Sequence, residues 1–226
     1  TVEYDVTRAA EGSARVRIGN TEVLAGVKTA IAAPYPDTPD QGNLSVNAEL
    51  LPLSSPRFES GPPGEQATEV ARLADRGIRE SKAINVKELC ITPGELVWSV
   101  MIDVMSINDE GNLLDAASVA AIAALRDAKF PSVVDGKIDY LKKTDKAIPL
   151  KETPIGVSVI KIGPHLLVDP LTEEEDEADA RMTIATKSDG NLCALQKGGS
   201  TPLTPEEIDQ MVGIAQEKGD ELRKCL

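Results

Sequence analysis

Residues 115–128 constrain the fold more than any other part of the chain, because this segment is apolar almost all round. A helix with apolar residues on every face is stable only where other elements cover it on several sides. Half of its residues are alanine, whose small side chain lets neighbouring elements approach closely. Asp115 is the expected N-cap. We therefore predict a helix over residues 115–128 that lies buried between layers.

The residues before this helix carry strand patterns and one further helix. Apolar and polar residues alternate at period two, which is typical of half-buried strands. The strand-like runs are residues 13–18, 21–33, 44–50, 87–91 and 95–105. Residues 66–83 instead place their apolar side chains along one face at helical spacing. This half of the chain is therefore predicted to combine a sheet with two helices.

The second half of the chain again combines strand-like runs with a helix. Its strand-like runs are residues 138–141, 156–162, 166–168, 181–186 and 192–196. A helix follows, with Thr204 as N-cap, Pro205 in the first position and Glu207 completing a capping box. We predict an α/β (α+β) chain of two lobes, with mixed sheets and packed helices. The periods of the two halves differ, so the internal repeat is weak.

Composition narrows the classes of function. The chain has 24 basic and 37 acidic residues, a net charge of −13, so most of its surface repels a phosphate backbone. Three cysteines without CxxC spacing argue against a disulfide framework or a zinc site and favour a reducing, intracellular compartment. No stretch has the roughly 20 apolar residues of a membrane span. The chain starts without Met in a strand-like run, so we expect an N-terminal arm before it.

Arg72, Arg76 and Arg79 lie on one face of the predicted helix, at spacings of four and three. A row of guanidinium groups binds phosphates well, because each planar fork donates two parallel hydrogen bonds. Ion pairing on the helix surface is an equally common use of such arginines. The carboxylates available for that pairing are Glu69, Asp75 and Glu80. Spacing alone leaves both interpretations open.

Two further features have a functional and a plain interpretation. The acidic run at 173–177, with Asp179 beyond it, could hold a divalent metal, but blocks of like charge are usually solvated loops, and we predict a loop and no metal. His165 is the only histidine, and a general base would need a partner that the sequence does not show. We therefore favour a structural role for His165 and assign no cofactor.

Several segments together resemble the RNase PH family. They are residues 11–28, 75–80 followed by 89–91, 102–111, Phe130-Pro131, and 169–185. The pattern is most similar to the family's non-catalytic subunits in the archaeal exosome. The resemblance implies an RNase PH-like fold of two βαβα-type lobes, which we place at residues 1–130 and 131–226.

The resemblance also implies partners. Such a subunit alternates with a catalytic RNase PH-like paralogue in a heterohexameric ring, under RNA-binding cap subunits, in the cytoplasm. The ring shortens single-stranded RNA from its 3′ end by phosphorolysis. In that context Arg76 and Arg79 match arginines that hold RNA phosphates, so we predict them as RNA-binding residues. Arg57 and Phe58 are further candidates to face the channel.

The same comparison implies that this chain does no chemistry itself. Active members carry Asp-Gly-Gly-Thr-Arg before a helix and bind the attacking phosphate there, whereas residues 109–113 here read Asp-Glu-Gly-Asn-Leu. Glu110 adds negative charge and Leu113 replaces the arginine, and both changes oppose anion binding. The place of the family's catalytic aspartate is taken by Arg181 or, with a two-residue gap, by Asp179. We therefore assign no catalytic residue.

Two rival functions remain. One is a self-sufficient phosphorolytic exoribonuclease, against which Glu110 and Leu113 argue. The other is a purely structural ring member whose arginines only pair with neighbouring carboxylates.

Overall fold

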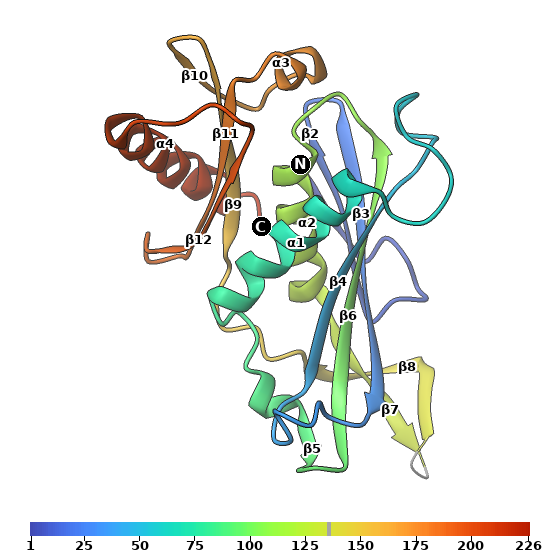
Figure 1. Ribbon diagram of the computed structural model, residues 1–226. Coiled ribbons are helices and arrows are strands. Elements are labelled where there is room, and N and C mark those ends of the chain that lie inside the picture. Colours follow the sequence, from blue (N-terminus) through green and yellow to red (C-terminus); the bar gives the residue numbers. More distant parts are fainter. Residues whose placement is uncertain (135–136) are drawn as a thin grey trace.

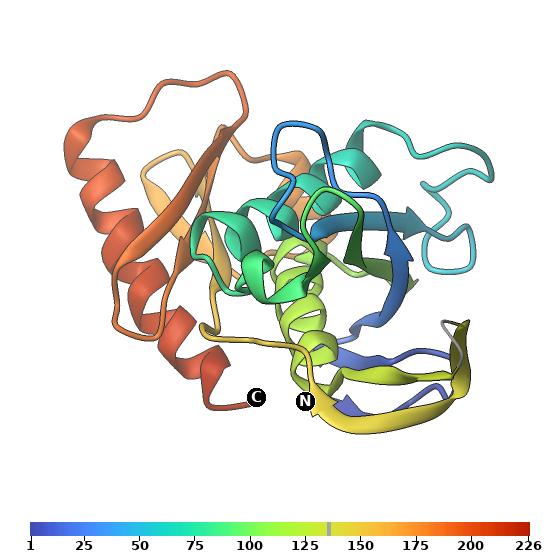
Figure 2. The ribbon, with the colours of Figure 1, turned by 90° about the horizontal axis from the view of Figure 1, so that it is seen from below.

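The computed structural model describes residues 1–134 and 137–226. Figure 1 shows four layers, in the order sheet, helix pair, sheet and helix. Seen from below in Figure 2, the C-terminal helix flanks one side, and the N-terminal sheet lies on the other. The middle helices therefore have a sheet on each side, as the apolar segment at 115–128 requires.

The N-terminal sheet contains six strands, and its main path has the order β1-β2-β3-β6-β4. These strands are β1 (Val2–Tyr4), β2 (Gly12–Ile18), β3 (Thr21–Ala32), β4 (Asn43–Leu50), β5 (Cys90–Thr92) and β6 (Leu96–Asn108). Neighbours are antiparallel except β4 and β6, which run parallel. Helix α1 (Glu65–Glu80) lies in the connection between these two, because parallel neighbours need a crossover.

Helix α2 (Leu113–Asp127) confirms the buried helix. It packs on β2 and β3 on one side and on β9 (Ile155–Ile162) on the other. Ten of its residues besides Asp115 are buried, mostly alanines. A Cβ on Gly12 of β2 would lie 2.4 Å from the carbonyl oxygen of Ala124, so only glycine allows this close approach.

The predicted start of α2 is wrong by three residues. Asn112 is the N-cap, in a left-handed conformation, and its side chain does not cap the helix. Asp115 lies in the first turn and is buried, and its Oδ1 accepts a hydrogen bond of 2.8 Å from the backbone N–H of Ser158. It serves the contact with the second sheet instead of the cap.

The second sheet is antiparallel, with the order β10-β9-β11-β12. Its strands are β9 (Ile155–Ile162), β10 (His165–Val168), β11 (Ala180–Thr186) and β12 (Leu192–Gly198). Helix α4 (Pro205–Arg223) packs on β9 and β11. The predicted capping box is confirmed, because Glu207 N–H donates to Thr204 Oγ1 at 3.2 Å and Thr204 N–H donates to the Glu207 carboxylate at 2.9 Å.

Three short segments differ from prediction. Residues Val86–Leu89 form a 3-10 helix (η1), and the strand expected at 87–91 shrinks to β5. Strand β8 (Lys137–Ala147) extends the predicted run at 138–141 and pairs with β7 (Lys129–Val134), which had not been predicted. The sequence pattern did not indicate β7, because it contains Pro131 and proline argues against a central strand. Helix α3 (Thr172–Asp176) stands where a loop was expected.

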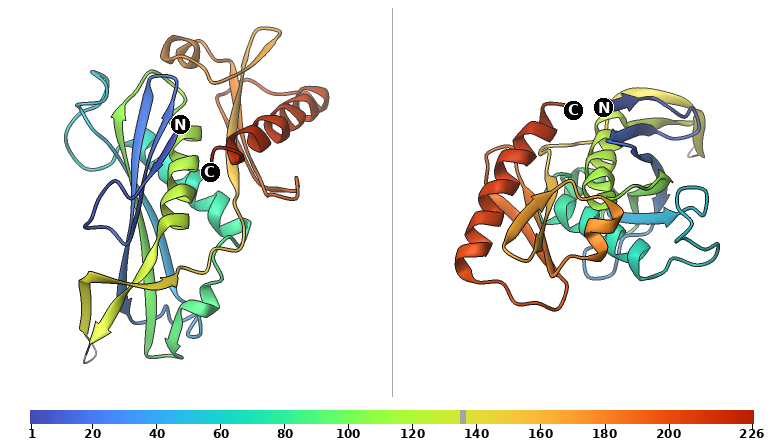
Figure 3. Two further views of the ribbon diagram at one scale, coloured as in Figure 1. Left: turned by 180° about the vertical axis from the view of Figure 1, so that it is seen from behind. Right: turned by 90° about the horizontal axis from the view of Figure 1, so that it is seen from above.

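One hydrophobic cluster runs from the first sheet through α2 into the second. The chain ends also meet, because the hydroxyl of Tyr4 donates to the carbonyl oxygen of Leu226 at 2.9 Å; Figure 3 shows the two termini side by side. A division at residue 130 stays a prediction. Among the described residues, none of the helices combines the length and apolar character that a membrane crossing needs.

Candidate nucleic-acid interface

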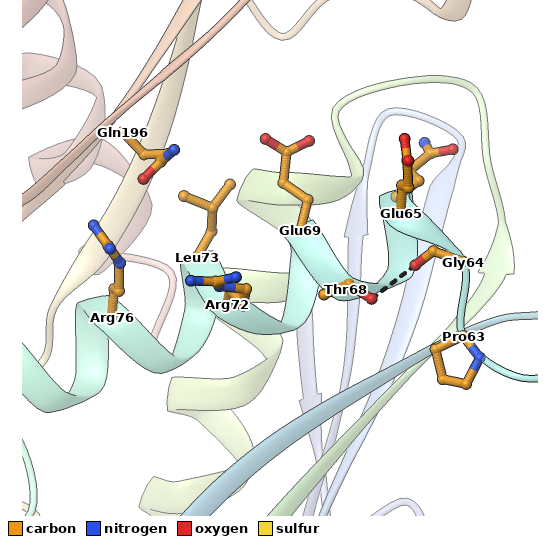
Figure 4. Close-up of a pocket in the computed structure, with 10 residues that line it drawn as sticks. Pro63, Gly64, Glu65, Thr68, Glu69, Arg72, Leu73, Arg76 and Gln196 are labelled. Atoms are coloured by element: carbon orange, nitrogen blue, oxygen red, sulfur yellow. Dashed lines mark hydrogen bonds between the residues drawn. The ribbon is translucent and has the colours of Figure 1, made fainter.

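An open groove of about 930 Å³ runs along α1 beside β12. Its lining residues are Pro63, Gly64, Glu65, Gln66, Thr68, Glu69, Arg72, Leu73, Arg76 and Gln196. Arg72 and Arg76 are exposed, and Figure 4 shows them on α1 beside Gln196, which comes from β12. Sequence reasoning missed Gln196, because no local signal ties a strand residue to a helix more than a hundred positions earlier.

Two of the three carboxylates near the arginine row are already paired. Glu69 binds Arg181 of β11, and Asp75 binds Arg79. Within residues 1–134 and 137–226, Arg72 and Arg76 form no ion pair. The groove therefore has two unpaired guanidinium groups, while Arg79 is engaged in a pair.

Arg79 makes three hydrogen bonds. Its Nε and Nη2 donate to the two oxygens of Asp75 at 3.0 and 2.7 Å, and Nη2 also donates to the carbonyl oxygen of Leu44 at 3.0 Å. The hydrogen bonds with Asp75 raise the pKa of the Arg79 guanidinium above its usual range. A guanidinium has five N–H donors. The half-exposed side chain thus keeps its Nη1 group for a further acceptor.

Arg181 and Asp179, the two alternatives for the position of the family's catalytic aspartate, have different surroundings. Arg181 reaches across to Glu69 on α1. Asp179 Oδ2 instead accepts a hydrogen bond of 2.7 Å from the backbone N–H of Gly163, in the β9–β10 turn. Of the two, the side chain that faces α1 is therefore a cation.

The turn before α2 has no free amide for an anion. Asp109 N–H donates to the Ser54 carbonyl at 2.9 Å, and Glu110 N–H donates to Thr21 Oγ1 at 3.0 Å. Gly111 N–H donates to Asp109 Oδ1 at 3.1 Å. The remaining amide, of Asn112, donates to Glu175 Oε1 at 2.9 Å. Each backbone N–H from 109 to 112 is thus bound within the chain.

The acidic run is not the solvated loop that we expected. Its first part forms α3, where Glu175 is partly buried against the turn before α2, and burial raises the pKa of its carboxyl group. Asp176 pairs with Arg57. The described part of the chain contains no group of three or more His, Cys, Asp or Glu residues placed to hold a metal ion.

The remaining candidates are not among the residues that line the groove. Arg57 is held by its ion pair with α3, and Phe58 packs partly buried against the core. Whether either faces a channel stays a prediction. His165 is exposed at the start of β10.

Two sheets that enclose a shared helix pair, with two unpaired arginines in a groove along one of those helices, resemble the RNase PH class of proteins. Family models bear this out: "3' exoribonuclease family, domain 1" matches residues 1–131 and "3' exoribonuclease family, domain 2" matches residues 152–218. The chain belongs to this family, which confirms the resemblance drawn from its sequence.

Individual relatives are similar over nearly the whole chain. A protein of Methanosarcina acetivorans named "Exosome complex component Rrp42" is 47% identical over 98% of this chain and 82% of its own length. The solved structure of an Archaeoglobus fulgidus exosome with RNA bound to the active site contains a chain 44% identical to this one. The match covers 99% of this chain and 86% of the chain in the solved structure, with a TM-score of 0.91.

A further structure, of an archaeal exosome core, has a chain 39% identical to this one. It covers 99% of this chain and 84% of that chain, with a TM-score of 0.87. The matched chains of both solved structures are therefore similar to this chain in fold and in sequence.

Proposed function

We propose that this chain is a non-catalytic, RNase PH-like subunit of an archaeal exosome that degrades RNA in the 3′ to 5′ direction by phosphorolysis. The observation that carries the proposal is the turn before α2. Its four backbone amides are bound within the chain, and Leu113 stands where active members have an arginine. Phosphoryl chemistry depends on positioning and on charge stabilisation, and this turn supplies neither for a phosphate.

The partners belong to the same proposal. The chain forms a heterohexameric ring with a catalytic RNase PH-like paralogue, carries RNA-binding cap subunits and works in the cytoplasm. The names of the relatives support membership of an exosome complex. Within the ring this chain scaffolds the active site of its paralogue.

Arg76 and Arg79 contact single-stranded RNA in this proposal. Arg76 supports it most directly, because it is exposed in the groove and has no ion pair among the described residues. Arg79 must share its guanidinium between Asp75 and RNA. The pair is only partly exposed, but the Nη1 group of Arg79 is not used by Asp75 or by Leu44. A phosphate can therefore compete for Arg79.

The pairing of Arg79 with Asp75 also favours the purely structural rival, in which no arginine of α1 touches RNA. Crosslinking of RNA to the assembled ring over a range of salt concentrations separates the two. Contact through Arg76 and Arg79 gives crosslinks on α1 that fall with salt. A structural member gives none on α1 at any salt concentration.

The test of the proposal is a degradation assay with RNA and inorganic phosphate. The isolated chain should release no nucleoside diphosphate, whereas the complex with its paralogue should. Phosphate-dependent release by the isolated chain would establish the rival, a self-sufficient phosphorolytic exoribonuclease, and end the non-catalytic assignment.

A further inference from the structure

The acidic run has no part in the function proposed so far, yet α3 occupies a defined place. Figure 1 shows α3 over the end of the N-terminal sheet, next to the connection from β6 to α2. The two segments are far apart in sequence, since Asn112 and Glu175 are separated by 63 positions. Their contact therefore joins the C-terminal half of the chain to the N-terminal half.

Three polar contacts hold the segment from Asp169 to Asp176 there. Glu175 Oε1 accepts the backbone N–H of Asn112 at 2.9 Å, and Asp169 Oδ1 accepts its side-chain Nδ2 at 2.9 Å. Asp176 forms the third contact, an ion pair with Arg57 in the loop before α1. Both the backbone and the side chain of Asn112 thus bind carboxylates from the same segment.

The backbone fits this contact closely. Gly111 has φ of +103°, and a Cβ there would lie 2.2 Å from the carbonyl oxygen of Pro170. Only glycine tolerates both the conformation and the approach. The turn before α2 is thereby pressed against the residues that lead into α3.

Helix N-termini attract anions, because their first N–H groups lack intrahelical partners and the helix dipole is positive there. Asn112, the N-cap, does not satisfy these groups with its own side chain. The carboxylate of Glu175, from a distant part of the chain, binds the backbone N–H of Asn112 at this end of the helix. This carboxylate thus lies at the start of α2, where it binds the N–H of the N-cap and not an N–H of the first helical turn.

We propose that the carboxylate of Glu175 serves as an internal anion at the N-terminus of α2 and prevents phosphate from binding there. Helix α3 thereby acts as a latch, a segment that connects the two halves of the chain. The inference deepens the non-catalytic role proposed above. Its test uses no RNA, so the two can fail separately.

The first measurement is hydrogen exchange of the amides of residues 110–113 in the full chain. We expect Glu175→Ala to speed their exchange roughly five- to tenfold, the usual effect of losing a helix cap. Glu175→Gln keeps an acceptor but loses the charge, so it should give a smaller increase and remain folded if the alanine variant does not. Glu173→Ala and Glu173→Gln are the matched controls, because Glu173 is exposed on the same helix.

Equal exchange in the Glu175 and Glu173 variants would overturn the latch. The second measurement adds inorganic phosphate to the unaltered chain, with chloride of equal ionic strength as the reference. We expect no phosphate-specific slowing of exchange at residues 110–113. Slowing there would mean that phosphate reaches the amides despite Glu175, and the proposed closure would be wrong.

Discussion

Arg76 and Arg79 lie less than one turn apart on α1, but they have different neighbours. Asp75 and the carbonyl oxygen of Leu44 hold Arg79, while Arg76 faces the groove with Gln196 opposite. Arg181 binds Glu69 and so removes the carboxylate that could otherwise pair with Arg72 or Arg76. Individual side chains therefore determine which cations of this acidic chain remain available to a phosphate.

Replacing both Arg76 and Arg79 by Glu should leave the ring assembled but reduce its RNA degradation. Each lost phosphate contact also removes released counterions, so the salt slope of RNA binding should fall by roughly 0.7 per contact. Binding titrations at several salt concentrations measure this. The control is Arg8→Glu with Lys224→Glu, two exposed cations outside the groove lining.

The melting temperature of the double variant must be measured first, because the Arg79→Glu change places a second carboxylate beside Asp75. An intact ring with the parental degradation rate and salt slope would make these arginines ordinary surface charges.

Asp115 predicts a pH dependence of stability. Burial raises the pKa of its carboxyl group from 3.8 to about 7. The folded state therefore holds this proton more tightly than the unfolded state, and its stabilising effect is full below about pH 4 and lost as the pH rises through about 7. The amide of Asp115→Asn does not titrate, and its oxygen can still accept a hydrogen bond from the N–H of Ser158.

The stability of Asp115→Asn relative to the parent should therefore increase between pH 4 and pH 7, by at most about 1.4 kcal/mol per pH unit. Urea unfolding at several pH values measures this difference. Asp209→Asn, an exposed change of the same kind on α4, serves as control. A difference that stays constant across this range would show that Asp115 does not titrate there.

At the scale of elements, α1 and α2 differ in how much of their surface is buried. α1 buries one stripe and leaves its arginines at the surface, whereas α2 is covered on both sides. The small residues of α2 and Gly12 bring the sheets close to it. Helix α2, packed between the sheets, contacts α1 and so supports the position of the groove.

The cap of α4 carries a prediction at this scale. Thr204→Ala removes the oxygen that accepts Glu207 N–H, so stability should fall by about 0.5–2 kcal/mol. For a chain of this length each kcal/mol lowers the melting temperature by roughly 2–4 °C. Calorimetry of the variant beside Ser200→Ala, an exposed change just before the helix, measures it. Equal melting temperatures would mean that the capping box contributes nothing.

For the whole molecule, a ring subunit needs large contacts with its neighbours. Several apolar side chains are exposed and available for such contacts; they include Tyr35, Leu53, Ile91, Leu96 and Leu195. Obligate interfaces typically bury more than about 2,000 Å². These side chains are therefore candidates for contacts with partners.

We expect this chain to form a one-to-one complex with a catalytic RNase PH-like paralogue and to close into a hexamer. Light scattering of the co-purified proteins measures the mass directly. Each protein alone is the control. A stable monomer of this chain that persists beside its purified partner would count against the ring.

Local patterns in the sequence determined most of the elements. Alternation at period two located β2 and β4, and the Thr204-Pro205 start with Glu207 located α4, because these signals depend on residues only a few positions apart. The buried character of α2 also follows from its own residues. The resemblance to the RNase PH family likewise lies in the order of residues.

Tertiary structure decided the contacts of the site. Glu175 reaches Asn112, Arg181 reaches Glu69, and Gln196 joins the groove, each across more than sixty positions. A sequence shows which side chains can pair, but the packing of the second sheet against α1 and α2 selects which pairs form. This is why the arginine row and a possible i,i+4 pair of Asp75 with Arg79 were visible in the sequence, whereas the availability of Arg76 was not.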